Sequence, residues 1–434
     1  MARRLKSEAM KQALLRSNTH LLMTAVMLFQ ATGMLLLTFK TNPIDTQALI
    51  MAGVLPLVTW GAVNLYGKLW QVDRALMILV MFLCSVGLVT LQDITRSAST
   101  PLSQAIYAGG GLVAMAAGIV LMRRLRRWDK YLYWAMGLAL LFLLLPLVIG
   151  QVKNGAKNWI QLGKGDDAPS LQPSEFVKPV LILCLAAGLS GKPRLLKCLP
   201  VVGYAAVLCG VLLLEKDLGA LLLYFLVTCV VFYAATSNGL LTLAGLGLGA
   251  GGAVGAYHLF PYVAERVEMF LNPWSDPQDS GYQIIQALIA IGSGGLFGMG
   301  LGLGYPRNIP LYHSDFIFAA ICEEYGLIFA LGLLGIYLVI VLRGASVAMN
   351  ARSSFHALTA LGVVALIGIQ TLVIVGGNTR LIPLTGVTLP YISAGGSSMV
   401  SMMGAAGLLL GVSSINAHDE LEDYKRWASM EEDL

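Results

Sequence analysis

The chain has 434 residues, of which 57% are hydrophobic and 12% charged, and its formal net charge is +5. With a mean hydropathy of +0.73, this composition excludes an ordinary soluble enzyme and indicates a polytopic membrane protein. The sequence contains no Walker loop, dinucleotide fingerprint or zinc motif, so ATP-driven transport by this chain alone is not expected.

Apolar runs of about 20 residues, the length that crosses a bilayer, recur along the whole chain. No cleavable signal pattern precedes the first run, which is therefore expected to be an anchor. As one helix, the stretch 199–235 would be about 55 Å long, so it is divided at Glu215–Gly219. The sequence predicts one all-α integral membrane domain, 1–434, with twelve spans near 20–39, 47–66, 74–91, 101–122, 131–151, 176–190, 199–214, 218–235, 240–260, 316–342, 355–375 and 392–414.

Cations in the short loops predict the orientation. Basic residues gather on the side that holds both termini, which we expect to be cytoplasmic: Arg3, Arg4, Lys6, Lys11, Arg16, Arg123, Arg124, Arg126, Arg127, Lys192, Arg194, Lys197, Arg343 and Arg352. By parity the loops 152–175, 215–217, 261–315 and 376–391 lie outside, after an N-terminal five-span region, 1–151. The acidic tail 416–434 is expected to be cytoplasmic and solvated. The net positive charge suits anionic membrane lipids and does not indicate nucleic acid.

The six cysteines are scattered and form no C-x-x-C pair. Nearly all of them fall inside apolar runs. They are expected to be small buried hydrophobic residues rather than disulfides or metal ligands.

One carboxylate stands where the polar loop 261–315 enters an apolar helix. Asp315 follows His313 and Ser314 and precedes a run of apolar residues. An acid at a membrane boundary costs solvation free energy and is a functional candidate. The alternative is a hydrated interfacial acid with no further role. Glu323 and Glu324, further into this helix, are expected to face the protein interior or water.

The loop 152–175 offers other candidates. Lys157 beside Trp159 could meet a phosphate and stack on a sugar or lipid, although a lone Trp is equally an interfacial anchor. Glu175 in the first turn of the next helix shares a helical face with Lys178, and this pair could be only structural. Asp217, between two spans, is expected to cap the second one.

The later outer segments contain short or broken elements. The stretch 281–292 is too short to span and predicts an interfacial or re-entrant helix. The glycine-rich stretch 294–304 would let backbone approach a ligand, or pack flexibly against lipid. The segment 376–390, with Arg380, indicates broken backbone covered by protein or a water-filled cavity. Ser397 and Ser398, at the start of the last helix, could hold a diphosphate or serve close helix packing.

Together these residues resemble the SEDS family of bacterial cell-wall polymerases, which includes RodA, FtsW and SpoVE. The resemblance covers about 150–414 in family order: the 155–163 loop, Gln172–Glu175, Asp217–Gly219, Asn272–Trp274, Gly281–Gln283, His313–Phe318 with Glu323 and Glu324, and Pro383–Ser398. The family has about ten spans, so this chain looks extended by two N-terminal ones. Departures are Lys216 for a common proline, Ala394 for a common tyrosine, Arg380 for a small residue, and an insertion at 164–170.

The resemblance implies a peptidoglycan glycosyltransferase that polymerises lipid II at the outer face of the bacterial cytoplasmic membrane. It makes Asp315 the general base for attack on an undecaprenyl-diphosphate-linked glycan, with inversion at the anomeric carbon. The candidate substrate-binding residues are Lys157, Trp159, Glu175, Lys178, Asp217, His313, Arg380, Ser397 and Ser398.

The resemblance also implies a class B penicillin-binding protein, a transpeptidase, as partner. A divalent cation could share the charge of the diphosphate, although the sequence offers no clear ligand set for a metal. A lipid II flippase and a non-catalytic scaffold for a transpeptidase are the alternatives. The sequence does not distinguish a role in elongation, division or sporulation.

Overall fold

The computed structural model describes residues 2–40, 43–95, 99–124, 128–153, 156–161, 163, 170–191, 195–279 and 281–432. The predicted insertion at 164–170, apart from Ser170, and the loop cations Arg126, Arg127, Lys192 and Arg194 lie outside this part. So do the side chains of the basic residues that precede residue 19.

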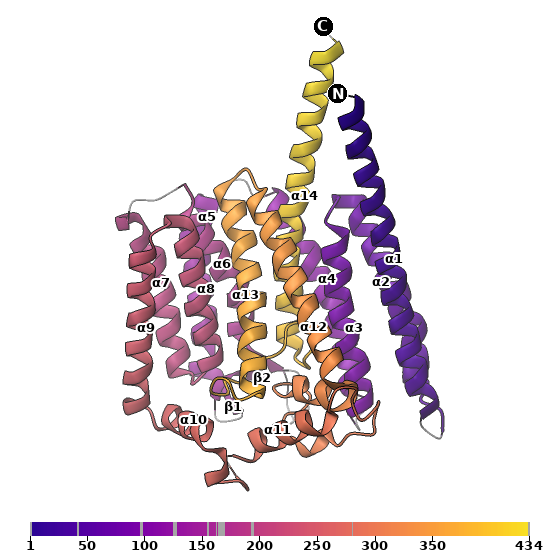
Figure 1. Ribbon diagram of the computed structural model, residues 1–434. Helices are drawn as coiled ribbons and strands as arrows, with labels where there is room; N and C mark the ends of the chain where they lie inside the picture. Colours follow the sequence, from indigo (N-terminus) through magenta and orange to yellow (C-terminus); the bar gives the residue numbers. More distant parts are fainter. Residues whose placement is uncertain are drawn as a thin grey trace.

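Long helices account for most of the described chain (Figure 1). They are α1 (Ala2–Lys40), α2 (Thr46–Trp70), α3 (Arg74–Ile94), α4 (Ser99–Arg124), α5 (Trp128–Ile149), α6 (Pro173–Leu189), α7 (Leu195–Leu214), α8 (Leu218–Thr236), α9 (Gly239–Leu259), α12 (Ile317–Met349), α13 (Ser354–Asn378) and α14 (Gly396–Glu432). Among described residues, 11 of these helices are long and apolar enough to cross a membrane. The remaining one, α6, has 17 residues, at the lower end of the length range of about 17 to 25.

These helices confirm the predicted all-α membrane fold and the division of 199–235 into α7 and α8. Three details differ from expectation. Helix α14 continues to Glu432 instead of ending near 414, so the acidic tail is helical, and its residues 420–426 are exposed. The loop 152–175 contains a small antiparallel sheet of β1 (Gln151–Lys153), β2 (Ala156–Gln161) and β3 (Ser170–Leu171). The outer loop 261–315 contains α10 (Pro261–Leu271), which the sequence analysis did not predict.

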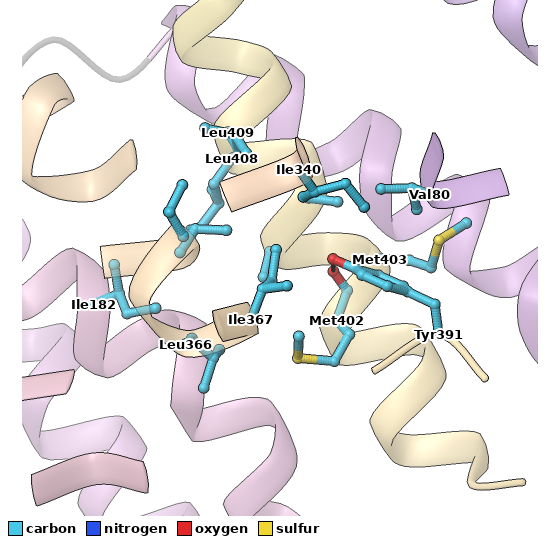
Figure 2. Packing of buried hydrophobic residues seen from close by; sticks show 14 of the residues in the cluster. Val80, Ile182, Ile340, Leu366, Ile367, Tyr391, Met402, Met403, Leu408 and Leu409 are labelled. Atoms are coloured by element: carbon cyan, nitrogen blue, oxygen red, sulfur yellow. Dashed lines mark hydrogen bonds between the residues drawn. The ribbon is translucent and has the colours of Figure 1, made fainter. Parts of the chain in front are cut away.

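The core is built around α14, which packs along α4 and also contacts α6, α12 and α13. Glycines allow α4 and α14 to approach closely: a Cβ at Gly118 would lie 2.7 Å from the carbonyl oxygen of Gly404. Figure 2 shows Met402, Leu408 and Leu409 of α14 beside Ile367 of α13 and Ile340 of α12. These side chains are all buried, so the inner half of α14 is fixed by apolar contact.

The irregular elements gather at one end of the bundle. The sheet, α10 and the predicted short helix α11 (Tyr282–Gly294) lie at the end opposite both termini (Figure 1). Two 3-10 turns, Pro273–Ser275 and Pro306–Asn308, lie in the same long loop. We call this end the loop face and the other the terminal face.

The segment between α13 and α14, residues 379–395, is not helical, as predicted. Leu389, Tyr391 and Ile392 within it are buried, so protein covers this backbone. The Ser393 hydroxyl donates to the Ser314 carbonyl oxygen at 2.6 Å, and the Ala394 amide donates to that of His313 at 2.9 Å. The segment is thereby fastened to the turn that precedes α12.

Candidate active site

Asp315 lies on a tight turn before the first residue of α12. The carbonyl oxygen of Leu311 accepts hydrogen bonds from the amides of Ser314, Asp315 and Phe316, at 3.0, 3.1 and 3.3 Å. The Asn378 side chain donates to the Asp315 carbonyl oxygen at 2.8 Å and accepts from the Ala319 amide at 3.2 Å. The backbone from Asp315 to Ala319 is therefore held by α13.

Two cavities meet at this carboxylate. The smaller, of about 270 Å³, extends towards β2 and the starts of α6 and α14, and the larger, of about 630 Å³, lies under α10 and α11. Five residues line both: Lys216, Arg266, Leu311, Asp315 and Gly386. Gly386 has φ +71°, and a Cβ there would lie 3.6 Å from Asp315 Oδ2. Asp315 thus stands in the wall that the two cavities share.

Burial decides the protonation of this group. It raises the pKa of Asp315 to about 6, against the lowering effects of a hydrogen bond from Ser314 and the positive charge of Arg266. Burial also lowers the pKa of the His313 imidazole. At neutral pH, Asp315 is therefore mostly a carboxylate whose proton affinity is higher than that of an exposed aspartate, which suits a general base.

Arg266 is a cation that acts electrostatically on Asp315. Burial lowers its pKa, and the negative charges of Asp217 and Asp315 oppose that effect. The guanidinium Nη1 donates to the Leu384 carbonyl oxygen at 3.3 Å. Lys216, the other cation in the shared wall, has its ammonium 5.3 Å from the centre of the Tyr262 ring. Arg266 and Lys216 therefore line both of the cavities that meet at Asp315.

Asp217 accepts hydrogen bonds from several residues around the smaller cavity. Its Oδ2 accepts from Asn158, Gln172 and Ser174 side chains at 2.9, 2.9 and 3.0 Å. Its Oδ1 accepts from the Ala220 amide at 3.0 Å, so the predicted cap of α8 is confirmed. One carboxylate thus joins β2, the start of α6 and the start of α8.

The structure brings most of the predicted site residues together. Six of the nine proposed substrate-binding residues line the smaller cavity with Asp315: Trp159, Glu175, Asp217, His313, Ser397 and Ser398. Ser397 Oγ accepts from the Gln172 amide at 3.1 Å, and Ser398 Oγ lies 2.7 Å from Thr388 Oγ1. The start of α14 is therefore part of the cavity wall.

Three predicted cations line neither cavity. Lys157 donates to the Leu147 carbonyl oxygen at 2.8 Å, and the buried Lys178 donates to Glu175 Oε1 at 2.7 Å. Arg380 donates to the carbonyl oxygens of Phe270 and Leu271 at 2.9 and 2.6 Å, at the end of α10. Their charges stabilise the fold around the site.

Arg266, which was not among the predicted site residues, lines both cavities instead. Its sequence signal is weak: Pro261 marks a helix start, and three charged residues, Glu265, Arg266 and Glu268, follow among apolar ones. Lys216 was noted only as a departure from the family pattern. A partly buried guanidinium on an unpredicted helix could not be distinguished from an interfacial anchor by sequence alone.

Glu323 and Glu324, the two acids of α12, have structural contacts. Glu323 and Glu324 are buried, as predicted, and accept from the amides of Tyr305 at 3.0 Å and Gly302 at 3.2 Å. The glycine-rich stretch 294–304 therefore packs against α12, and its residues line neither cavity. In the described part of the chain, no group of three or more His, Cys, Asp or Glu side chains is placed to hold a metal ion.

Comparisons with known proteins place this arrangement in a family. A family profile described as "Cell cycle protein", covering FtsW, RodA and SpoVE, matches residues 67–418. The peptidoglycan glycosyltransferase RodA of Mycobacterium tuberculosis is 37% identical over 317 residues, which cover 69% of this chain and 67% of that protein. Stage V sporulation protein E of Bacillus subtilis is 35% identical over 362 residues, which cover 79% of this chain and 96% of that protein.

Solved structures agree with the sequence relatives. A chain in a structure described as a peptidoglycan synthase complex that coordinates polymerization and crosslinking has a TM-score of 0.67 at 30% identity, covering 80% of this chain and 98% of its own length. The RodA protein of Thermus thermophilus has a TM-score of 0.60 at 28% identity, covering 80% of this chain and 98% of its own. Because the profile spans most of the chain, this multi-pass membrane protein belongs to the SEDS family of FtsW, RodA and SpoVE.

Proposed function

We propose that this chain is a peptidoglycan glycosyltransferase that polymerises lipid II, with Asp315 as its general base. The observation that carries this proposal is the position of Asp315 in the shared wall of two cavities. A glycan polymerase must hold two sugar substrates at once, with the attacking hydroxyl beside the base.

The reaction follows from this placement. Asp315 takes the proton of the GlcNAc 4-hydroxyl of one substrate while that oxygen attacks the anomeric carbon of the other. As the new bond forms on one face of that carbon, its bond to the diphosphate oxygen breaks on the opposite face. The configuration therefore inverts, and undecaprenyl diphosphate leaves. The proton stays on the Asp315 carboxyl and passes to solvent before the next cycle.

Arg266 and Lys216 serve the leaving group. Both line the two cavities beside Asp315, where negative charge develops on the departing diphosphate. Ser397 and Ser398 add donors at the N-terminal end of α14, a position that favours anions. Trp159, whose ring lines the smaller cavity, provides a flat surface for a sugar.

The orientation belongs to the same proposal. The loop face lies outside and both termini are cytoplasmic, in the cytoplasmic membrane of a bacterium. The described cations Arg123 and Arg352 support this orientation, because they line one cavity together with His418 of α14 on the terminal face. A class B penicillin-binding protein is the proposed partner, since the related chain of the synthase complex comes from an assembly that couples polymerization to crosslinking.

The test is glycan-chain formation from purified lipid II in liposomes. Wild type is compared with Asp315→Ala and with Asp419→Ala, a matched control on the terminal face, each alone and with a candidate transpeptidase. Polymer from wild type and Asp419→Ala, but not from a folded Asp315→Ala, is the expected result. Equal polymer from Asp315→Ala would remove Asp315 as the base, and no polymer from wild type under any condition would favour a flippase or a scaffold.

A further inference from the structure

The helices α1 and α2 form a hairpin that lies almost entirely outside the family match, which begins at residue 67. The hairpin stands at one edge of the bundle beside α3 (Figure 1). It is fastened by buried polar contacts as well as apolar ones: Gln30 of α1 donates to Thr59 at 2.8 Å and to Ser85 of α3 at 2.6 Å. Such contacts between membrane helices favour one specific arrangement.

Lys40, the last residue of α1, meets two acids of the family core. Its ammonium donates to Asp93 Oδ1 at the end of α3, where the Asp93 side chain is only 1% exposed. Glu324 of α12 is also buried and interacts with both Asp93 and Lys40. In the described part of the chain, Lys40 is the one lysine or arginine in an ion pair with either acid.

The same cluster holds the loop that leads to Asp315. The Gly302 amide donates to Glu324 Oε1 at 3.2 Å. Gly302 has φ +65°, and a Cβ there would overlap the Lys40 ammonium and lie 2.7 Å from Asp93 Oδ1. Arg307, further along this loop, donates to the Ile94 carbonyl oxygen at 2.7 Å. The loop therefore rests on the end of α3 and on the three charged side chains.

Two carboxylates this close in a low-dielectric environment repel each other unless a shared proton or a cation compensates them. The two carboxyl groups also lie within side-chain hydrogen-bonding reach of each other. Lys40 is the one cation that pairs with this cluster in the described part of the chain, so its removal changes the charge balance of both acids. Because Gly302 touches all three groups, a rearrangement of the acids must move the loop.

We infer that Lys40 is a positioning residue, through which the additional hairpin α1–α2 holds the loop that carries Asp315. The inference rests on the proposed function, because Asp315 chemistry is its most direct readout. The hairpin is then an internal support for catalysis that the common core of the family does not contain.

The test compares charge with shape. Lys40→Met keeps a long apolar side chain but removes the charge, Lys40→Arg keeps the charge, and Lys40→Met/Asp93→Asn removes the charge together with one acid. Lys68→Met, at an exposed position near the end of α2, is the matched control. We expect polymerisation to fall about tenfold in Lys40→Met, to stay near wild type in Lys40→Arg and Lys68→Met, and to recover in the double variant.

Hydrogen exchange of residues 295–315 gives a second readout that does not need activity. We expect faster exchange in Lys40→Met than in wild type, and a return in the double variant. Unchanged exchange and activity in Lys40→Met, or no recovery of either in the double variant, would overturn the inference. If wild type itself makes no polymer, the proposed function fails and the exchange comparison decides the role of Lys40 alone.

Discussion

Two cavities of equal volume lie at opposite faces of the molecule, and they differ in how their charged side chains are paired. Each has a volume of about 630 Å³, one under α10 and α11 on the loop face, the other between the ends of α4, α5, α6, α13 and α14 on the terminal face. Both contain arginine and an acid. Neither the cavity volume nor the types of charged residue in the wall therefore distinguish the two cavities.

The difference lies in how the charges are used. On the terminal face, Arg352 forms ion pairs with Asp419, at 3.6 Å, and with Asp423 of the α14 extension. On the loop face, neither Asp315 nor Arg266 forms a direct ion pair within the described part of the chain, although each influences the other electrostatically. Charged groups that are partly buried but not paired, as here, retain their capacity to act on a substrate.

The strongest test of this difference is to neutralise one acid on each face. Asp315→Asn keeps the shape of the side chain but removes its basicity, so we expect a loss of polymerisation of about 10² to 10⁴-fold. Asp419→Asn removes half of a paired contact and should leave the rate within about twofold. Rates of glycan formation under identical lipid II concentrations measure both, and similar losses in the two variants would refute the assignment.

The arginines offer the second test. Arg266→Gln removes positive charge from the place where the diphosphate departs, and we expect a loss of about 100-fold, mainly in kcat, because that charge develops in the transition state. Arg352→Gln is the control on the terminal face, with an expected change below about threefold. If Arg266→Gln raises KM with unchanged kcat, Arg266 binds substrate without stabilising the leaving group.

The helices could be predicted from sequence because apolar length is a strong signal. The expected spans and the turn at Glu215–Gly219 all match helices or helix ends in the structure. The sheet was missed because β1 and β3 have only 3 and 2 residues, and their pairing depends on contacts across a loop. Helix α10, with 11 residues, is too short to be recognised from hydrophobic periodicity alone.

The site could be predicted in part. Asp315 stands out from its sequence because a carboxylate at the start of an apolar helix is unusual, and Ser397 and Ser398 follow a broken segment. The cations could not be assigned in the same way. Lys157 donates to the carbonyl oxygen of Leu147, and Arg380 donates to those of Phe270 and Leu271. No local sequence feature reveals these partners.

The pH dependence provides a third test of the loop-face cavity. Because Asp315 must be deprotonated to act and burial raises its pKa to about 6, activity should be full well above pH 6 and fall as pH drops, by about tenfold at pH 5. Arg266→Gln removes a charge that lowers the pKa of Asp315, so the midpoint should move to higher pH. A flat profile of kcat/KM from pH 5 to about 7.5 would show that another group is the base.

The smallest expected effect concerns Arg380, which the sequence made a candidate for the diphosphate. The structure places its guanidinium on the carbonyl oxygens that end α10, the helix that carries Arg266. Arg380→Gln should therefore lower thermal stability modestly and reduce the rate by no more than about threefold, since α10 also remains held by the bond from Tyr262 to the Leu213 carbonyl oxygen. Thermal unfolding and polymerisation rates, compared with Arg266→Gln, separate the two roles. A loss of rate as large as that of Arg266→Gln at unchanged stability would mean that Arg380 reaches the substrate directly.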